Sequence, residues 1–314
     1  MNSLREAVKE YLLLRRNLGY HLRVPGRLLH SFAAFAEREK ATHITTDLAL
    51  RWAQQPADAR AATWAVRFQT VRRFAIWLST SDRRTEVPPD GLLPYRYERK
   101  RPYIYSEADI TNLVRTASQL PSPAGLKGRT FATLFGLLAV TGMRISEALA
   151  LDREDVNLQE GILRICRSKF GKSRLVAVHE STRQILADYA RARDRVVQRP
   201  ATAAFFLSER GGRVTEWAAR YNFAKVSREV GLRTPTTNCR HGRGPRLHDM
   251  RHRFATYTLL NWYRAGIDVA REIPKLATYL GHVHVNETYW YLEAVPELLE
   301  LATRRLESPK ETTP

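Results

Sequence analysis

Cysteine is scarce in this 314-residue chain, which has only Cys166 and Cys239. Two cysteines so far apart form neither a metal-ligand spacing nor a disulfide framework. The sequence also has no glycine-rich phosphate loop and no acidic cluster of the kind that binds a metal. We therefore expect reduced thiols in a cytoplasmic protein, and nothing favours zinc. The two missing motifs are consistent with a protein that uses no metal and no cofactor.

Long apolar runs are absent as well. The most apolar stretch, residues 131–140, is too short to cross a bilayer and predicts a helix buried on every side. The N-terminal segment mixes acidic and basic residues in an amphipathic pattern, unlike a signal or transit peptide. These two observations exclude a membrane span from the expected architecture.

Acidic residues are outnumbered, since 32 Asp and Glu stand against 51 Lys and Arg, for a formal net charge of +19. An excess of this size concentrates polyanions around the protein, and nucleic acid is the leading candidate partner. An anionic membrane surface and simple solubility are the alternatives. The hydrophobic content of 44% indicates a globular protein, and the length allows two domains.

The first 87 residues predict a small helical domain. Apolar residues recur at three- and four-residue steps, with Gly19 ending the first helix, Pro25 opening the second, and Thr46 or Asp47 capping the third. A fourth helix is expected over residues 61–78, and arginines lie between its apolar positions. Two of these arginines are candidate DNA contacts, although for any single one a solvated face is the better explanation: Arg67 and Arg72.

Residues 88–103 predict a linker, because their prolines oppose regular helix. An extended basic strand between two domains suits a phosphate backbone, and a solvated hinge is the alternative. The basic residues of this segment are Arg96, Arg99, Lys100 and Arg101.

Residues 104–314 predict a second, mostly helical domain. The apolar runs 162–166 and 175–178 flank a polar turn and predict a β-hairpin, to which Phe205–Leu207 is a candidate edge strand. Further helices are expected over 181–198, 215–230, 247–265, 268–280 and 287–306. The predicted fold class is therefore mainly α with a small antiparallel β-sheet (α+β).

Three motifs in this domain carry residues suited to chemistry. In TGMRISEALAL, residues 141–151, Arg144 follows the apolar helix and needs an anionic partner, for which Glu147 is the internal candidate. In LHDMRHRFAT, residues 247–256, a helix places His248 and Arg251 on one face, and His252 is the alternative inward residue.

The third motif is LGHVHVNETYWYL, residues 280–292, in which His282 precedes Tyr291 by nine residues. A histidine at such a break is also commonly a cap or a core residue. Tyr289 and Tyr291 are two residues apart, which is about 200° on a helix, so they face opposite sides. Tyr291 shares its side with Thr288 and is predicted to point inward.

Six residues from these motifs and from the hairpin turn occur in one fixed order: Arg144, Lys169, His248, Arg251, His282 and Tyr291. This order and these local sequences resemble the catalytic domain of the tyrosine recombinases, the phage-integrase family. The motifs cover residues 104–305, and residues 1–87 resemble that family's core-binding domain in position and helical pattern only. The resemblance implies a two-domain, site-specific recombinase that cleaves and rejoins DNA through a covalent 3′-phosphotyrosine, in integration, excision or transposition of a mobile element.

The resemblance also assigns roles. Tyr291 is the nucleophile, and two arginines, Arg144 and Arg251, hold the non-bridging oxygens bidentately. His248 and His282 donate hydrogen bonds to the same phosphate or move a proton. Lys169 best matches the general acid for the leaving 5′-oxygen, and Lys172, three residues on, is the alternative or a phosphate contact.

Further expectations concern supporting residues, a basic loop, the DNA partner and the C-terminal helix. Glu147 and Asp249 are read as supports for an arginine or for the backbone. The basic loop RHGRGPR is either a phosphate clamp or a solvated loop, through Arg240, Arg243 and Arg246. The partner is double-stranded DNA, bound by a homotetramer on paired sites with or without accessory or sister recombinases. The helix expected over residues 296–306 docks onto its own domain or onto the next protomer.

Two rival functions remain open from the sequence. A DNA-binding protein without catalysis would use the same scaffold but has no need of Tyr291. A type IB topoisomerase shares the chemistry and relaxes DNA without pairing sites. Length and the two-domain plan favour the recombinase.

Overall fold

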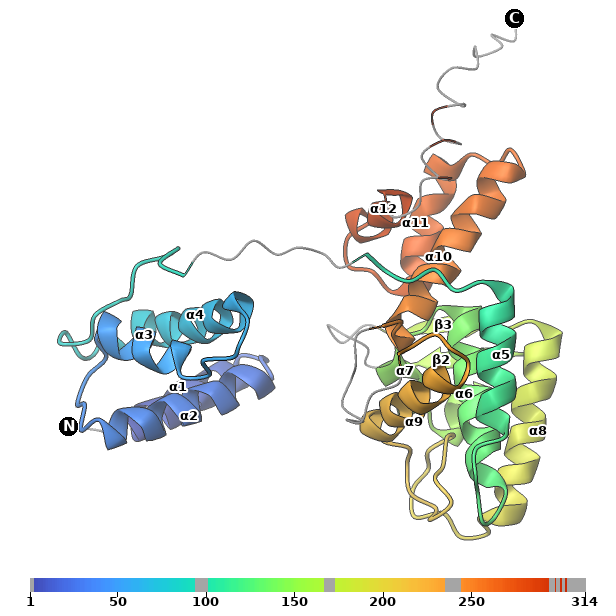
Figure 1. Cartoon of the computed structure of the whole chain (residues 1–314), viewed down its shortest axis with the longest axis horizontal. Helices are drawn as coiled ribbons and strands as arrows, with labels where there is room; N and C mark the ends of the chain where they lie inside the picture. Colours follow the sequence, from blue (N-terminus) through green and yellow to red (C-terminus); the bar gives the residue numbers. More distant parts are fainter. Residues whose placement is uncertain are drawn as a thin grey trace, which may run out of the picture. The chain divides into compact units, whose positions relative to one another are not determined.

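The computed structural model describes residues 3–93, 101–166, 173–234 and 244–293, together with Glu297, Glu300 and Thr303. The chain divides into two compact units, Met1–Lys100 and Arg101–Pro314 (Figure 1). Helices dominate, and the strands form one three-stranded antiparallel sheet, which confirms the predicted fold class. Within the described residues, no helix is both long and apolar enough to cross a membrane.

The first unit is a helical bundle with its own apolar core. Its helices are α1 (Leu4–Asn17), α2 (Arg23–Arg38), α3 (Thr46–Gln54) and α4 (Ala61–Leu78). Thr45 caps α3, one residue before the position expected from the sequence, because its hydroxyl accepts a hydrogen bond from the Leu48 amide. Trp52 is fully buried and packs edge-on against Phe32, so these two rings fasten α3 to α2.

The second unit contains the remaining elements. Its helices are α5 (Glu107–Ser118), α6 (Leu126–Thr141), α7 (Ile145–Ala150), α8 (Glu180–Val196), α9 (Glu216–Glu229), α10 (Leu247–Arg264), α11 (Val269–Leu280) and α12 (Asn286–Glu293), with a 3₁₀ turn at Arg153–Asp155. Its strands are β1 (Val156–Asn157), β2 (Ile162–Ile165) and β3 (Arg174–Ala177).

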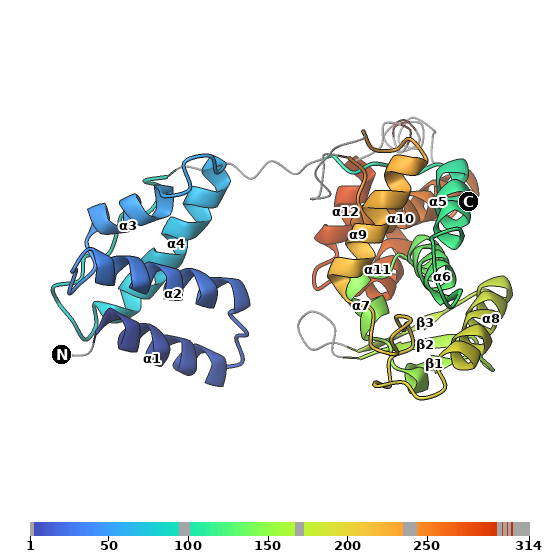
Figure 2. The same cartoon turned by 60° about the horizontal axis from the view of Figure 1, so that its bottom comes forward.

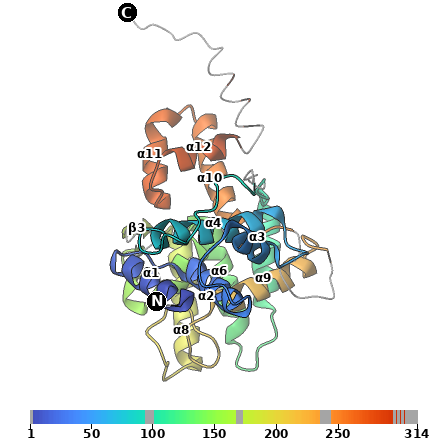
Figure 3. The same cartoon turned by 90° about the vertical axis from the view of Figure 1, so that its left-hand side faces the viewer.

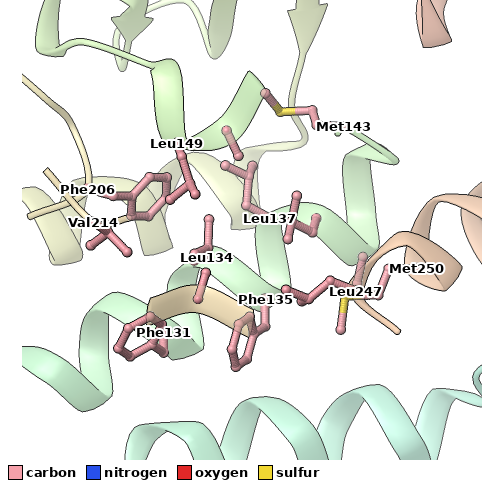
Figure 4. Close-up of a cluster of buried hydrophobic side chains, with 14 of the residues drawn as sticks. Phe131, Leu134, Phe135, Leu137, Met143, Leu149, Phe206, Val214, Leu247 and Met250 are labelled. Atoms are coloured by element: carbon pink, nitrogen blue, oxygen red, sulfur yellow. The ribbon is translucent and has the colours of Figure 1, made fainter. Parts of the chain in front are cut away.

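Helix α6 runs through the main core of this unit. Phe131, Leu134, Phe135 and Leu137 point into a cluster that also receives side chains from α7, α10 and the loops around α9 (Figure 4). The sequence predicted a helix buried on every side; the helix is present and mostly buried, but Val140 is exposed and Ala132 and Gly136 are partly exposed. Such burial fixes the C-terminal end of α6, from which the first catalytic candidate emerges.

The sheet has the order β1-β2-β3, and Figure 2 shows its strands side by side. Strands β2 and β3 pair with Ile162 opposite Ala177, which confirms the predicted hairpin. The expected edge strand at Phe205–Leu207 is wrong. Its backbone amides donate instead to the Leu151 carbonyl and to the Tyr189 hydroxyl, so the segment does not extend the sheet.

Helices α10, α11 and α12 pack together at one end of the second unit (Figures 1 and 3). They share a separate apolar cluster, in which Leu259, Ile273 and Leu280 are almost completely buried beside Tyr291. This cluster holds the chain segments that carry the last two motifs. Of the helix expected over residues 296–306, all but Glu297, Glu300 and Thr303 lies outside the described residues.

Candidate active site

Arg144 lies at the N-terminal cap of α7, just after α6 ends at Gly142 in the left-handed conformation. Its Nη1 donates to Glu147 Oε1 at 2.8 Å, and its backbone amide donates to Oε2 at 2.9 Å. The ion pair allowed by the sequence spacing is thus present. Glu147 is buried, with 3% of its side chain exposed, whereas 21% of the Arg144 side chain stays open to solvent. The guanidinium is therefore anchored and still reachable by an anion.

Arg251 projects from α10 and is almost completely buried. Its Nη1 donates to the Gly142 carbonyl at 2.9 Å and its Nη2 to the Leu280 carbonyl at 2.7 Å. These carbonyls end α6 and α11, where unpaired acceptors and the helix dipole favour a cation. Burial lowers the pKa of Arg251, while a hydrogen bond with the Tyr291 side chain acts to raise it.

His282 follows Gly281, whose left-handed conformation ends α11. Its Nδ1 lies 2.7 Å from the hydroxyl oxygen of Thr288, a residue with no exposed surface. Because this contact occupies Nδ1, the other ring nitrogen, Nε2, is left for a ligand. The histidine is therefore oriented by its own loop and the first turn of α12.

Tyr291 points inward, as predicted, with 3% of the residue exposed, whereas Tyr289 is 42% exposed. The centroid of the Tyr291 ring lies 5.9 Å from that of the His282 ring and 5.3 Å from that of the His252 ring. The His252 ring also contacts the His248 ring at 4.8 Å. Of the two histidines in the second motif, His252 is the buried one and packs against Tyr291, whereas His248 is exposed and contacts the His252 ring.

The electrostatic character of the site is strongly positive. Arg144 and a third arginine, Arg174, pair with the carboxylate of Glu147, and Arg251 donates to the carbonyls of Gly142 and Leu280. Burial acts to raise the pKa of Glu147, but hydrogen bonds from Arg174 and Arg144 outweigh it and lower the pKa to about 2. Three guanidiniums and one carboxylate leave a surplus of positive charge, so the arrangement is suited to receive an anion.

Both histidines respond to this surplus. Desolvation by surrounding protein and the charge of Arg251 lower the pKa of His248 to about 4, although part of its ring is exposed. Burial, then Arg251 and Arg144, lower the pKa of His282 to about 3. Both imidazoles are therefore neutral at physiological pH, able to accept a proton or to donate a hydrogen bond.

Arg174 and Thr288 are the site residues that the sequence interpretation did not assign to the chemistry. Arg174 had a signal in the strand alternation, because it shares a face of β3 with Val176, which is fully buried, while Leu175 is exposed. An arginine on a buried strand face needs a partner of opposite charge. Thr288 was placed on the inward face of its helix, but nothing in the sequence pairs it with His282.

Four of the candidate DNA contacts are described residues, and the others are not. Arg101 is exposed and Arg72 is half-buried on α4. The Arg246 side chain pairs with Asp249, whose carboxylate also accepts from the Arg246 amide. Arg67 donates to the Ala53 and Trp52 carbonyls at the end of α3, so it holds α4 to α3. The other candidates lie outside the described residues: Arg96, Arg99, Lys100, Lys169, Lys172, Arg240 and Arg243.

Comparison with known proteins gives a consistent match. The model of the phage integrase family matches residues 105–297. A Sinorhizobium fredii protein named as a candidate integrase/recombinase, y4rB, is 47% identical over 98% of both chains. Tyrosine recombinase XerD of Ralstonia nicotianae is 29% identical over 84% of this chain and 80% of its own.

A solved structure matches over the same extent. The Tn1549 transposon integrase, in complex with circular intermediate DNA, superimposes with a TM-score of 0.64 at 16% identity. The match covers 98% of this chain and the whole of that one. At this identity the similarity establishes a common fold.

Proposed function

This chain belongs to the phage integrase family and is a tyrosine recombinase, which cleaves and rejoins DNA at specific sites, and on that premise we propose that Tyr291 is its nucleophile. The Tyr291 oxygen attacks the scissile phosphorus, a phosphotyrosine forms at the 3′ end of the cut strand, and the bond to the 5′-oxygen breaks. Rejoining reverses these steps with a new 5′-hydroxyl. The phosphotyrosine conserves the bond energy, so no nucleotide cofactor is required.

The arginines stabilise the charge that this attack creates. Negative charge grows on the two non-bridging oxygens, and Arg144 and Arg251 are fixed donors that remain charged at any working pH. Each is held by backbone carbonyls or by Glu147 before DNA arrives. Preorganised donors of this kind cost no rearrangement at the moment of reaction, and this makes electrostatic stabilisation effective.

Two protons must move in each cleavage step. The ordinary pKa of a tyrosine hydroxyl is about 10, so a base is needed to take its proton. His248 and His282 are the candidates, and the ring of His282 packs against that of Tyr291. Their lowered pKa values make them weak bases in the free protein, and a bound phosphate, which offsets the charge of Arg251, raises those values. The leaving 5′-oxygen must gain a proton, which we assign to Lys169, with Lys172 as the alternative; both lie outside the described residues.

The observation that carries the assignment is the burial of Tyr291 against Arg251 and between two histidine rings. Trapping on a nicked suicide DNA substrate tests it directly. Tyr291→Phe removes only the hydroxyl and is expected to abolish the covalent protein–DNA adduct. Tyr289→Phe is the matched control, because it removes the same atom from an exposed ring two residues away and is expected to retain the adduct. An adduct that persists in Tyr291→Phe rules out the assignment.

The same proposal includes the DNA partner, the assembly and the biological context. The recombinase binds double-stranded DNA as a homotetramer on paired sites, and the first unit serves as the core-binding domain. The net charge of +19 and the DNA in the complex of the Tn1549 transposon integrase support DNA binding. The similarity to that transposon integrase and to y4rB favours the movement of a mobile element as its task.

A further inference from the structure

Three arginines hold three consecutive carbonyls at the end of α11. Arg174 Nε donates to Tyr279 at 2.7 Å, Arg251 Nη2 to Leu280 at 2.7 Å, and Arg144 Nη2 to Gly281 at 3.3 Å. The last carbonyls of a helix lack intrahelical partners and carry the negative end of its dipole. The C-terminus of α11 thus gathers the three guanidiniums, and His282 follows directly.

In Arg174 all three guanidinium nitrogens donate to carbonyls or to Glu147, whereas the corresponding bonds of Arg144 and of Arg251 use two nitrogens each. Nη1 and Nη2 of Arg174 donate to the two carboxylate oxygens of Glu147 at 3.1 and 2.8 Å, in addition to the bond to Tyr279. Only 11% of its side chain is exposed. Its guanidinium packs so closely on Gly281 that a Cβ there would lie 2.8 Å from Nη1. It is a poor candidate for direct contact with a phosphate.

We propose that Arg174 is a positioning residue for the phosphate receptor, by which we mean Arg144, Arg251 and His282. Arg174 holds Glu147 and the turn that precedes His282. This inference rests on the proposed function, because it assumes that Arg144 and His282 act on the scissile phosphate. Arg174 occupies one side of the Glu147 carboxylate and leaves Arg144 a single side-chain bond to it. Arg144 consequently keeps donors for the substrate.

Loss of Arg174 changes two things at once. Glu147 is freed to pair bidentately with Arg144, which neutralises the charge meant for the phosphate. The carbonyl of Tyr279 loses its bond to β3, so the turn carrying His282 loses a fixed anchor. These changes displace the Arg144 guanidinium and the His282 ring by small distances. Displacements of about 1 Å in a catalytic site reduce rates by about 100-fold.

The test uses the full-length protein and single-turnover cleavage of a nicked suicide substrate. Arg174→Gln is expected to lower the cleavage rate by about 100-fold while gel-shift affinity for the DNA stays unchanged. Arg174→Lys keeps the charge but cannot make the paired bonds to Glu147, so its rate should be intermediate. Arg164→Gln is the matched control, an exposed arginine on the adjacent strand, and should cleave at the wild-type rate.

Two further readouts separate positioning of the receptor from general stability. With a methylphosphonate at the scissile position, one non-bridging charge is absent, so the loss caused by Arg174→Gln should be much smaller than on the phosphodiester. In an Arg144→Gln background, Arg174→Gln should add little further loss, because the two residues act as one unit. A merely structural role predicts equal losses on both substrates and additive effects.

The outcomes are distinct. The proposal is overturned if Arg174→Gln cleaves at the wild-type rate. It is also overturned if Arg174→Gln loses the same fraction of its cleavage rate on both substrates and its effect adds fully to that of Arg144→Gln. If thermal melting shows that Arg174→Gln is unfolded, the same comparison with Arg174→Lys decides the matter. Failure of the wild-type protein to form any adduct would instead contradict the proposed function.

Discussion

At the scale of single residues, the site is organised around a surplus of positive charge. Arg144 and Arg251 are held in place by contacts that leave no carboxylate other than Glu147 to neutralise them among the described residues. Burial first, and this positive charge second, lower the pKa values of His248 and His282, so both remain neutral in the free protein. A bound phosphodiester adds the negative charge that is missing, and it favours protonation or hydrogen-bond donation by the same imidazoles.

The neutral histidines predict how the stability of the free protein depends on pH. In the unfolded chain a histidine titrates near pH 6.5, whereas the folded protein holds the pKa of His282 at about 3 and that of His248 at about 4. Between pH 6.5 and 4 the unfolded state thus binds more protons, so the free energy of unfolding should fall as the pH falls through this window.

Urea unfolding across this pH window measures the effect. His282→Gln removes one of the two groups and is expected to flatten the dependence. His284→Gln, which changes an exposed histidine two residues away, is the control and should leave the slope unchanged. Equal slopes in all three proteins would show that His282 titrates normally in the folded state. The acid loss associated with Glu147 begins near its ordinary pKa of about 4.5 and overlaps the lower end of this window, but all three proteins share it, so it cancels in the comparison of slopes.

At the scale of secondary structure, helix ends rather than helix faces build the site. Helix α6 ends at Gly142 and α11 ends at Gly281, both in the left-handed conformation. Arg251 donates to carbonyls at both ends and so ties the two helices together. The glycines matter because each lets the chain turn sharply into a catalytic segment.

Gly142 provides a prediction with a matched control. A Cβ at this position would lie 2.6 Å from Cδ1 of Phe254, whereas a Cβ at Gly125, which has a similar left-handed conformation, would meet nothing within 4 Å. Gly125→Ala should therefore cost only the left-handed strain, about 1–2 kcal/mol. Gly142→Ala adds a collision with a ring on α10, so chemical denaturation should show a clearly larger loss. Equal losses would mean that the end of α6 relaxes without displacing α10.

Regular elements and the site differ in how far the sequence could predict them. Helix periodicity and the hairpin pattern predicted most of the second unit, and the motifs contain Arg144, Arg251, His282 and Tyr291, which lie close together, whereas Lys169 lies outside the described residues. The clamp of Arg174 on Glu147 was not predicted, because it joins β3 to α7 across 27 residues and depends on how those elements pack. The segment Phe205–Leu207 was misread because three apolar residues fit an edge strand or a buried loop equally well.

At the scale of the whole molecule, two units with separate cores share one strongly basic chain. The net charge of +19 favours encounter with DNA, whereas the candidate catalytic groups among the described residues lie in the second unit. Charge therefore accounts for binding, and the local arrangement around Tyr291 accounts for chemistry. The two contributions should be separable by experiment.

Truncation of the C-terminal residues tests the proposed assembly. Deleting residues 296–314 leaves all described site residues up to Tyr291 in place. If this segment docks onto the next protomer, the truncated protein should bind a single DNA site normally in gel shifts. Formation of paired-site complexes, followed by native electrophoresis, should be strongly reduced. Equal losses of single-site binding and of pairing would indicate that the segment stabilises its own domain instead.

The central claim is that Tyr291 becomes joined to DNA, and peptide mapping of the trapped adduct measures this most directly. The wild-type protein is trapped on a suicide substrate, digested with protease and nuclease, and analysed by mass spectrometry. The account predicts a nucleotide attached through a 3′-phosphate to Tyr291 alone. A nucleotide on Tyr289 or on any other residue would contradict it.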